Sequence, residues 1–146
     1  MRSTSRSLAI MITILSVALA ACGQEAADAA PGAEAVTVTE IEDSELHRVT
    51  LSESAAARLG VEMVAVTEGT GGSLLIPYSA LLYDASGATW TYTSPDELVF
   101  VREQVEVELI DGDVAQLTAG PEAGTTVVTV GAAELWGAET GVGGGH

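Results

Sequence analysis

The chain has 146 residues, with 21 Asp and Glu against 5 Lys and Arg, and its formal net charge is −16 at pH 7. A protein that binds nucleic acid neutralises phosphates with clustered Lys and Arg, and this chain contains no Lys at all. Its composition therefore excludes nucleic-acid binding as the default function. The hydrophobic fraction of 47% excludes a wholly disordered chain, and the length allows one domain or two very small ones.

Residues 1–21 have the composition of a secretory signal peptide. A short head with two arginines is followed by an apolar stretch over 8–19 and by small residues before Cys22. This apolar stretch of about 12 residues is shorter than the roughly 20 that a membrane-spanning helix needs. We therefore expect a cleaved signal peptide rather than a permanent transmembrane helix.

The end of this segment, Leu19-Ala20-Ala21-Cys22, resembles the lipobox of bacterial lipoproteins, in which the cysteine is diacylated and becomes the first residue. The alternative is an ordinary signal peptide that leaves Cys22 as a free or disulfide-forming thiol. No internal disulfide can form, because Cys22 is the only cysteine. Two or more acyl chains on one residue give stable anchoring. We predict a protein anchored by a covalent lipid on Cys22, with no other cofactor.

The anchor implies a place in the bacterial cell envelope. The lipid holds the protein on the extracytoplasmic side, in the periplasm or at the outer membrane if two membranes are present. Its acidic surface would be repelled by anionic lipids, so the lipid and not a basic patch provides the anchoring.

The mature chain divides by composition into four parts. Residues 22–35 are rich in Ala, Gly and acids, and we expect a flexible tether there. Residues 36–68 predict a strand-helix-strand unit, and residues 74–136 predict a β domain. Residues 137–146 are rich in glycine and predict a flexible tail.

The strand-helix-strand unit has clear local signals. β-branched alternation at 36–39 and 48–51 predicts strands, and a further strand follows over 61–66. Between them Ser52 has the position of a helix N-cap, and Gly60 stands where a short helix would end in a left-handed residue.

From residue 74 onward the pattern is entirely β, except for one helical turn expected over 132–136. Residues 84–87 have the composition of a hairpin turn. The longest strand is expected to place these apolar side chains on one face: Val99, Val101, Val105, Val107 and Leu109. Its opposite face is expected to be polar, with Arg102, Gln104, Glu106 and Glu108. The predicted fold class is mainly β: a small β-barrel or β-roll of antiparallel strands with one or two short helices.

The order of these segments resembles a known family. The residues that carry the resemblance are Ile76-Pro77-Tyr78-Ser79-Ala80-Leu81-Leu82-Tyr83-Asp84 with Gly87, Trp90-Thr91-Tyr92, Val105-Glu106-Val107, Leu117-Thr118-Ala119-Gly120-Pro121 and Val127-Val128-Thr129-Val130-Gly131, together with Val49-Thr50-Leu51-Ser52 and Ala56-Ala57-Arg58-Leu59-Gly60-Val61. They are similar to the periplasmic adaptor subunits, or membrane fusion proteins of the secretion-protein D type, of RND-type efflux systems. The resemblance covers the membrane-proximal domain over 74–135 and the stretch that enters the adaptor core.

The resemblance implies a partner but not a complete adaptor. Family members carry a lipoyl-like domain and an α-helical hairpin, whereas here only 69–72 separates the two matching regions. Docking on an inner-membrane RND or related transporter is the part of the function that the resemblance implies. Candidate partner-binding residues are Trp90 and Tyr92, since aromatic side chains are favoured interface anchors, with Arg102 and Gln104 as a polar rim.

Catalysis has little support in the sequence. The only cysteine belongs to the lipobox, the only histidines are His47 and His146, and no Gly-x-Ser-x-Gly elbow occurs. We therefore expect no enzymatic activity.

One set of residues has the spacing of a metal site. Asp43, Glu45 and His47 at i, i+2 and i+4 would project from one face of a strand and offer two carboxylates and an imidazole. An exposed acidic segment is the commoner explanation, so no metal site is assigned and these three residues remain low-ranking candidates.

Three hypotheses follow. The first is a non-enzymatic, membrane-anchored lipoprotein that acts as an accessory of transmembrane efflux or secretion. The second is a free-standing extracytoplasmic lipoprotein that binds a metal or small ligand. The third is a remnant of an adaptor that has no partner.

Overall fold

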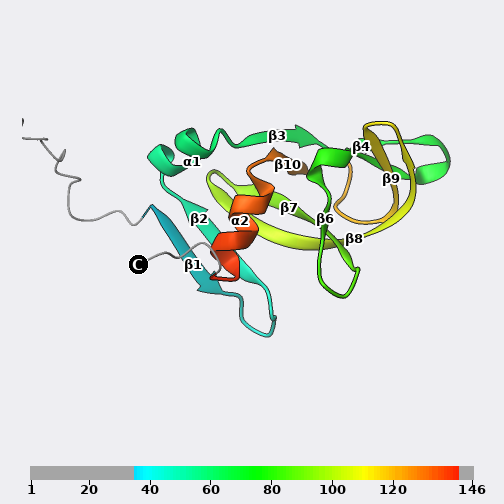
Figure 1. The fold of residues 1–146 in the computed structure, drawn as a ribbon. Helices are drawn as coiled ribbons and strands as arrows, with labels where there is room; N and C mark the ends of the chain where they lie inside the picture. The colour runs from blue at the N-terminus through cyan, green and yellow to red at the C-terminus, as the bar shows by residue number, and fades with distance from the viewer. Residues whose placement is uncertain (1–34, 142–146) are drawn as a thin grey trace, which may run out of the picture. The chain divides into compact units, whose positions relative to one another are not determined.

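The computed structural model describes residues 35–141. The predicted signal peptide, Cys22, nearly all of the predicted tether and the last five residues of the predicted tail lie outside the described residues. Within them the structure confirms a mainly β fold (Figure 1). The strands are β1 (Val36–Glu40), β2 (His47–Leu51), β3 (Glu62–Ala65), β4 (Thr67–Glu68), β5 (Leu74–Pro77), β6 (Leu82–Tyr83), β7 (Thr89–Asp96), β8 (Val99–Asp111), β9 (Val114–Ala119) and β10 (Thr126–Val130). The helices are α1 (Glu53–Leu59) and α2 (Ala132–Glu139), with 3-10 turns at Thr70–Gly72 and Tyr78–Ala80.

The strands form a nearly closed, antiparallel barrel. Their order is β3-β10-β7-β8-β9-β5-β4, and β3 and β4 follow each other directly along the chain. This bent segment pairs with β10 at one end and with β5 at the other, so it joins the two edges of the sheet. Between the two strands, the Val66 amide donates to the Thr125 carbonyl at 2.8 Å. Joining the ends of this strand path protects edges that an open sheet would leave free.

The short helix α1 forms where the capping residues predict it. The Ser52 hydroxyl accepts a hydrogen bond from the Ala55 amide at 3.2 Å, which satisfies one of the free donors of the first turn. Gly60 ends the helix at φ 62°, a conformation that glycine adopts without a Cβ clash.

Two hydrophobic cores lie on opposite sides of β8. The barrel core is formed by Val66, Ile76, Ala80, Leu81, Val105, Ala115, Leu117 and Val127. The helix-side core is formed by Val49, Leu51, Ala55, Tyr92, Phe100, Val128, Ala132 and Leu135. Because neighbouring side chains of a strand alternate between faces, β8 contributes Phe100 to one core and Val105 to the other.

The prediction of one apolar and one polar face for this strand is therefore wrong in two places. Phe100, on the face expected to be polar, is buried, and Leu109, on the face expected to be apolar, is 55% exposed. The reason is that both faces of the strand carry other elements: α2 covers one face, and the barrel encloses the other only as far as its end. A register shift between Val107 and Leu109 also interrupts the alternation.

The segments expected as two parts, 36–68 and 74–136, share one sheet. β2 pairs with β8, β3 with β10 and β4 with β5, so three of the four strands of the first segment have partners in the second. The turn Thr70–Gly72, expected as an internal break, connects β4 to β5, which pair as neighbours.

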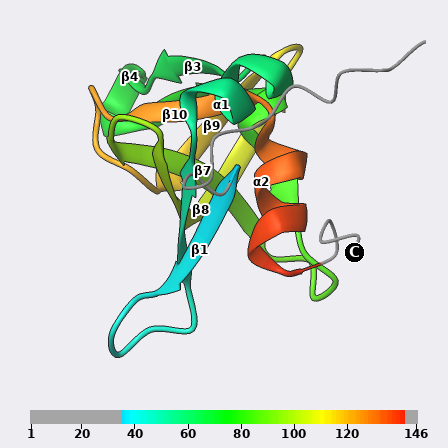
Figure 2. The ribbon, with the colours of Figure 1, turned by 90° about the vertical axis from the view of Figure 1, so that its left-hand side faces the viewer.

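The C-terminal helix is longer than the sequence indicates. α2 continues to Glu139 and ends at Thr140, so residues 137–139 are helical and are not part of a tail. The helix packs against β2 and β1 (Figure 2). Among the described residues, no helix has the length and apolar character needed to cross a membrane.

Candidate functional site

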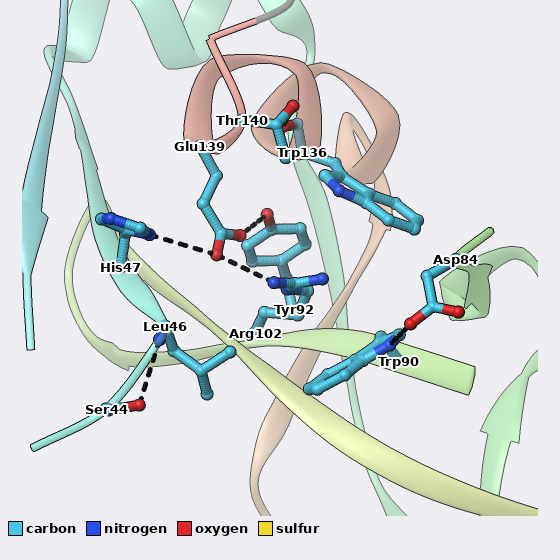
Figure 3. Close-up of polar contacts among 10 residues, drawn as sticks. All are labelled: Ser44, Leu46, His47, Asp84, Trp90, Tyr92, Arg102, Trp136, Glu139 and Thr140. Carbon is cyan, nitrogen blue, oxygen red and sulfur yellow. Dashed lines mark hydrogen bonds and ion pairs between the residues drawn. The ribbon is translucent and has the colours of Figure 1, made fainter. Parts of the chain in front are cut away.

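Glu139, the last residue of α2, places a buried carboxylate against the sheet. Its side chain is 1% exposed and accepts a hydrogen bond from the Tyr92 hydroxyl at Oε2. Its Oε1 accepts from Arg102 Nη2 at 3.2 Å and lies 3.8 Å from His47 Nδ1 (Figure 3). We call these four residues the Glu139 cluster.

Strand register brings the three partners of Glu139 together. Tyr92 and Arg102 face each other across the β7–β8 pair. The pairing of Arg48 with Val101 places His47 across from Arg102, on the same face of the sheet. α2 crosses this face, so its last turn carries Glu139 onto the three side chains.

Two tryptophans enclose the Arg102 guanidinium. Its Cζ lies 4.4 Å from the centre of the Trp90 ring and 5.4 Å from that of Trp136. Stacking on aromatic rings is a favourable environment for a guanidinium, because it is more weakly hydrated than an ammonium. Arg102 Nε is buried without a hydrogen-bond partner, so the guanidinium is held by the carboxylate at one end and by the two rings.

The electrostatics of the cluster explain why Glu139 tolerates burial. A carboxylate at a helix C-terminus is opposed by the helix dipole and loses its hydration. Arg102 supplies the compensating charge, and Tyr92 supplies a second donor. Burial, the hydrogen bond to Glu139 and the charge of that carboxylate all raise the pKa of Tyr92, so its hydroxyl remains a neutral donor. The hydrogen bonds of the cluster therefore hold the last turn of α2 against the sheet.

A second polar contact fixes the turn before β7. Asp84 Oδ2 accepts from Trp90 Nε1 at 3.0 Å, while Oδ1 accepts from the Ser86 amide and hydroxyl at 2.8 and 2.6 Å. These bonds favour the ionised carboxylate. The Ser86 hydroxyl, followed by the Trp90 indole, lowers the pKa of Asp84 to about 2.

The metal candidates do not gather at one site. Residues 41–46 form an irregular turn, so the strand geometry needed for Asp43, Glu45 and His47 to share a face is absent. Asp43 and Glu45 are exposed in the loop between β1 and β2, which projects from the fold (Figure 2), whereas His47 points to Glu139. Among residues 35–141 no group of three or more His, Cys, Asp or Glu side chains is close enough to hold a metal ion.

The partner-binding candidates lie mostly inside the fold. Tyr92 is 0% exposed, and the Arg102 side chain is 14% exposed, so both hold α2 and offer little contact surface. Trp90 is half-buried beside Arg102, and only Gln104 is exposed.

Glu139 is not among the site residues predicted from the sequence, because the glycines around it predict a tail. One signal was present. Ala132, Leu135 and Glu139 follow a helical i, i+3, i+7 spacing, and all three are buried on the same face of α2.

Hollows in the surface of the described residues include an apolar groove, a polar hollow and a third, smaller hollow. An apolar groove of about 460 Å³ lies between β1, α1 and α2, and its lining includes Val36, Val38, Leu59 and Ala138. A polar hollow of about 410 Å³ borders the turn at Thr70–Gly72. The third, of about 290 Å³, is lined by Leu75, Leu109, Asp111, Val114 and Gln116. We call this third hollow the β5-β9-β8 hollow.

Comparison with known proteins adds no further constraint. No family model matches the chain, and neither curated proteins nor solved structures contain a match to it.

Proposed function

We propose that this protein is a non-enzymatic lipoprotein of the bacterial envelope that serves as an accessory of a membrane transporter. Its described residues provide a folded docking unit, and a lipid on Cys22 holds that unit at the membrane. Such a partner acts by binding one conformation of the transporter better than another, since only differential affinity shifts a conformational equilibrium.

The observation that carries the proposal is the joining of the two segments of the family resemblance into one barrel. β2, which belongs to the first of these segments, pairs with β8, and β3, which directly follows that segment, pairs with β10. The described residues thus form a self-contained unit, with only a short turn between the two segments. A nearly closed barrel of this kind is suited to docking, because a preorganised surface loses little conformational entropy when a partner binds.

The chemistry of the buried groups also supports a binding role. The carboxylate of Glu139 is engaged by Tyr92, Arg102 and His47 inside the fold. A general acid or base must reach its substrate, and this carboxylate is 1% exposed. The raised pKa of Tyr92 follows from its burial and its hydrogen bond to Glu139, and the lowered pKa of Asp84 follows from the hydrogen bonds that it accepts from Ser86 and Trp90.

Crosslinking in intact cells tests the proposal. The full-length protein carries an affinity tag after His146, and covalently linked partners are identified after purification. We expect an inner-membrane transporter to be recovered with the wild-type protein. Recovery of the protein alone would overturn the proposal.

Two variants sharpen this experiment. Cys22→Ala removes the predicted lipid acceptor and should release the protein from the membrane fraction and abolish recovery of the transporter. Deletion of 74–135 is a poor control, because it removes the strands that pair with β2 and β3. Substitutions of exposed side chains that leave the fold intact are better matched.

The apolar groove between β1, α1 and α2 favours a second candidate function. Its volume of about 460 Å³ and its lining by Val36, Val38 and Leu59 suit a small apolar ligand. A free-standing ligand-binding lipoprotein would then bind a fluorescent naphthylamine probe at this groove. Val38→Glu should abolish that binding, and the exposed Val130→Glu should not.

A further inference from the structure

The charged residues of the described barrel are acidic with one exception. Between Gly60 and Gly131 the only basic residue is Arg102, which is enclosed by Trp90 and Trp136. The acids of this segment are Glu62, Glu68, Asp84, Asp96, Glu97, Glu103, Glu106, Glu108, Asp111, Asp113 and Glu122. The barrel therefore presents a negative field to any partner.

Exposed apolar side chains gather at the end of the barrel formed by β5, β8 and β9. Gln116 pairs with Leu75 on one side and with Leu109 on the other, so the three residues form a row across the outer face. Val114 begins the next row, between Asp111 and Pro77. Leu109 is 55% exposed and Val114 is 43% exposed, and together with Leu75 they line the β5-β9-β8 hollow.

Carboxylates border this apolar surface. Glu108 Oε2 accepts a hydrogen bond from Gln116 Nε2 at 2.9 Å, and Asp111 lines the hollow itself. Asp113 lies in the same hairpin turn, where its carbonyl accepts from the Tyr78 amide at 2.8 Å. The surface thus has an apolar centre and an acidic border, with no basic side chain from the β5, β8 and β9 segments near it.

We propose that the β5-β9-β8 hollow is the docking site, and that it receives a protein surface with an apolar side chain surrounded by Lys and Arg. This inference rests on the proposed function and names the surface and the chemistry of its partner. The apolar contact provides affinity, while the charge complementarity directs encounter and orientation. A second copy of the chain would place like charges against each other, and an anionic lipid surface would be repelled for the same reason.

The test is an NMR titration of residues 22–146 carrying Cys22→Ser. The probe is a peptide of alternating Leu and Lys, and the control is a peptide of Lys and Ser with the same charge. We expect the Leu-Lys peptide to shift signals of Leu75, Leu109 and Val114 first. The Lys-Ser peptide should bind at least 10-fold more weakly and shift acids over the whole barrel.

Two variants with similar exposure test the location. Leu109→Asp should weaken binding of the Leu-Lys peptide at least 10-fold, and Met63→Asp, at a position 45% exposed on β3, should leave it unchanged. Equal effects of the two variants, or shifts centred on another face, would overturn the inference.

The same variants separate this inference from the proposed function. If Leu109→Asp no longer recovers the transporter in cells, both stand. If recovery of the transporter is unchanged, the docking site is wrong and the transporter role remains. If the peptide binds at the hollow but no transporter is recovered, the proposed role as a transporter accessory is wrong, and the inferred binding chemistry of the hollow is supported.

Discussion

The two sides of β8 show two ways of holding a small β protein together. On the barrel side the core is apolar, and the outer surface carries acids alone. On the helix side a buried carboxylate and a guanidinium fasten α2, next to an apolar core of similar size. Arg102 lies on the helix side in the Glu139 cluster, and no other basic residue occurs between Gly60 and Gly131, so the outer surface of the barrel is acidic.

We expect the largest loss of stability from a substitution on the helix side of β8. Glu139→Ala leaves the buried Arg102 guanidinium without its counter-charge, and unpaired buried charges cost about 3–5 kcal/mol. We expect the free energy of unfolding to fall by about that amount in urea denaturation. Glu134→Ala, an exposed acid on the same helix, should change it by less than about 0.5 kcal/mol. Similar losses for the two variants would show that Glu139 does not fasten α2.

A substitution that creates a cavity in the barrel core tests how much this core contributes to stability. Leu117 is 0% exposed between β5 and β8. Leu117→Ala should lower the free energy of unfolding by about 3 kcal/mol, because the barrel wall cannot collapse into the space. Leu109→Ala, at the exposed end of β8, is the matched control and should cost less than about 0.5 kcal/mol.

Removing one donor of the Glu139 cluster should have a smaller effect. Tyr92→Phe keeps the ring in the helix-side core and removes only the hydroxyl that donates to Glu139. Hydrogen bonds to charged groups contribute about 1.5–3 kcal/mol, and we expect a loss in this range by thermal and urea denaturation. An unchanged stability would mean that Arg102 alone satisfies the carboxylate.

The pH dependence of Tyr92 gives an independent measurement of the same bond. Its pKa is raised in the folded protein, so its contribution is complete below about pH 10, the ordinary value for tyrosine, and is lost as the pH rises above it. Wild-type protein should therefore lose stability above pH 10 more steeply than Tyr92→Phe does. Parallel pH profiles would contradict this expectation.

The smallest expected effect is at the Asp84 turn. The pKa of its carboxyl falls from 3.8 to about 2, because Ser86 and Trp90 donate hydrogen bonds to the ionised form. The folded protein thus binds this proton less tightly than the unfolded chain, and the contribution is present above about pH 4 and lost toward pH 2. The stability difference between wild type and Asp84→Asn should shrink over that range, as followed by circular dichroism. A constant difference would show that the turn holds without the charge.

Local signals predicted the fold to the extent that neighbours in sequence decide it. Ser52 and Gly60 predicted both ends of α1, and β-branched alternation predicted β1 and β2. The faces of β8 were not predictable in the same way. Both of its faces contact other elements, so alternation of polar and apolar residues does not report which face meets water.

The candidate site was less predictable than the fold. The sequence predicts Tyr92 and Arg102 as contact residues, but their burial depends on α2, which lies far away in the sequence. His47 was singled out for metal chemistry, but its nearest carboxylate is Glu139 and not Asp43 or Glu45. No spacing rule connects positions 47 and 139, because only strand register and the path of α2 bring them together.

Composition and local motifs specify which chemical groups this protein carries: an acidic chain without lysine, one cysteine in a lipobox-like motif, two histidines, and enough β-branched residues for a β fold. Contacts between distant segments determine which of these groups are buried and which are exposed. Barrel closure left Leu109 and Val114 exposed at one end, and the packing of α2 buried Glu139 with Arg102. The physical reason is that burial and charge pairing are properties of contacts between distant segments, whereas capping and strand propensity act within a few residues.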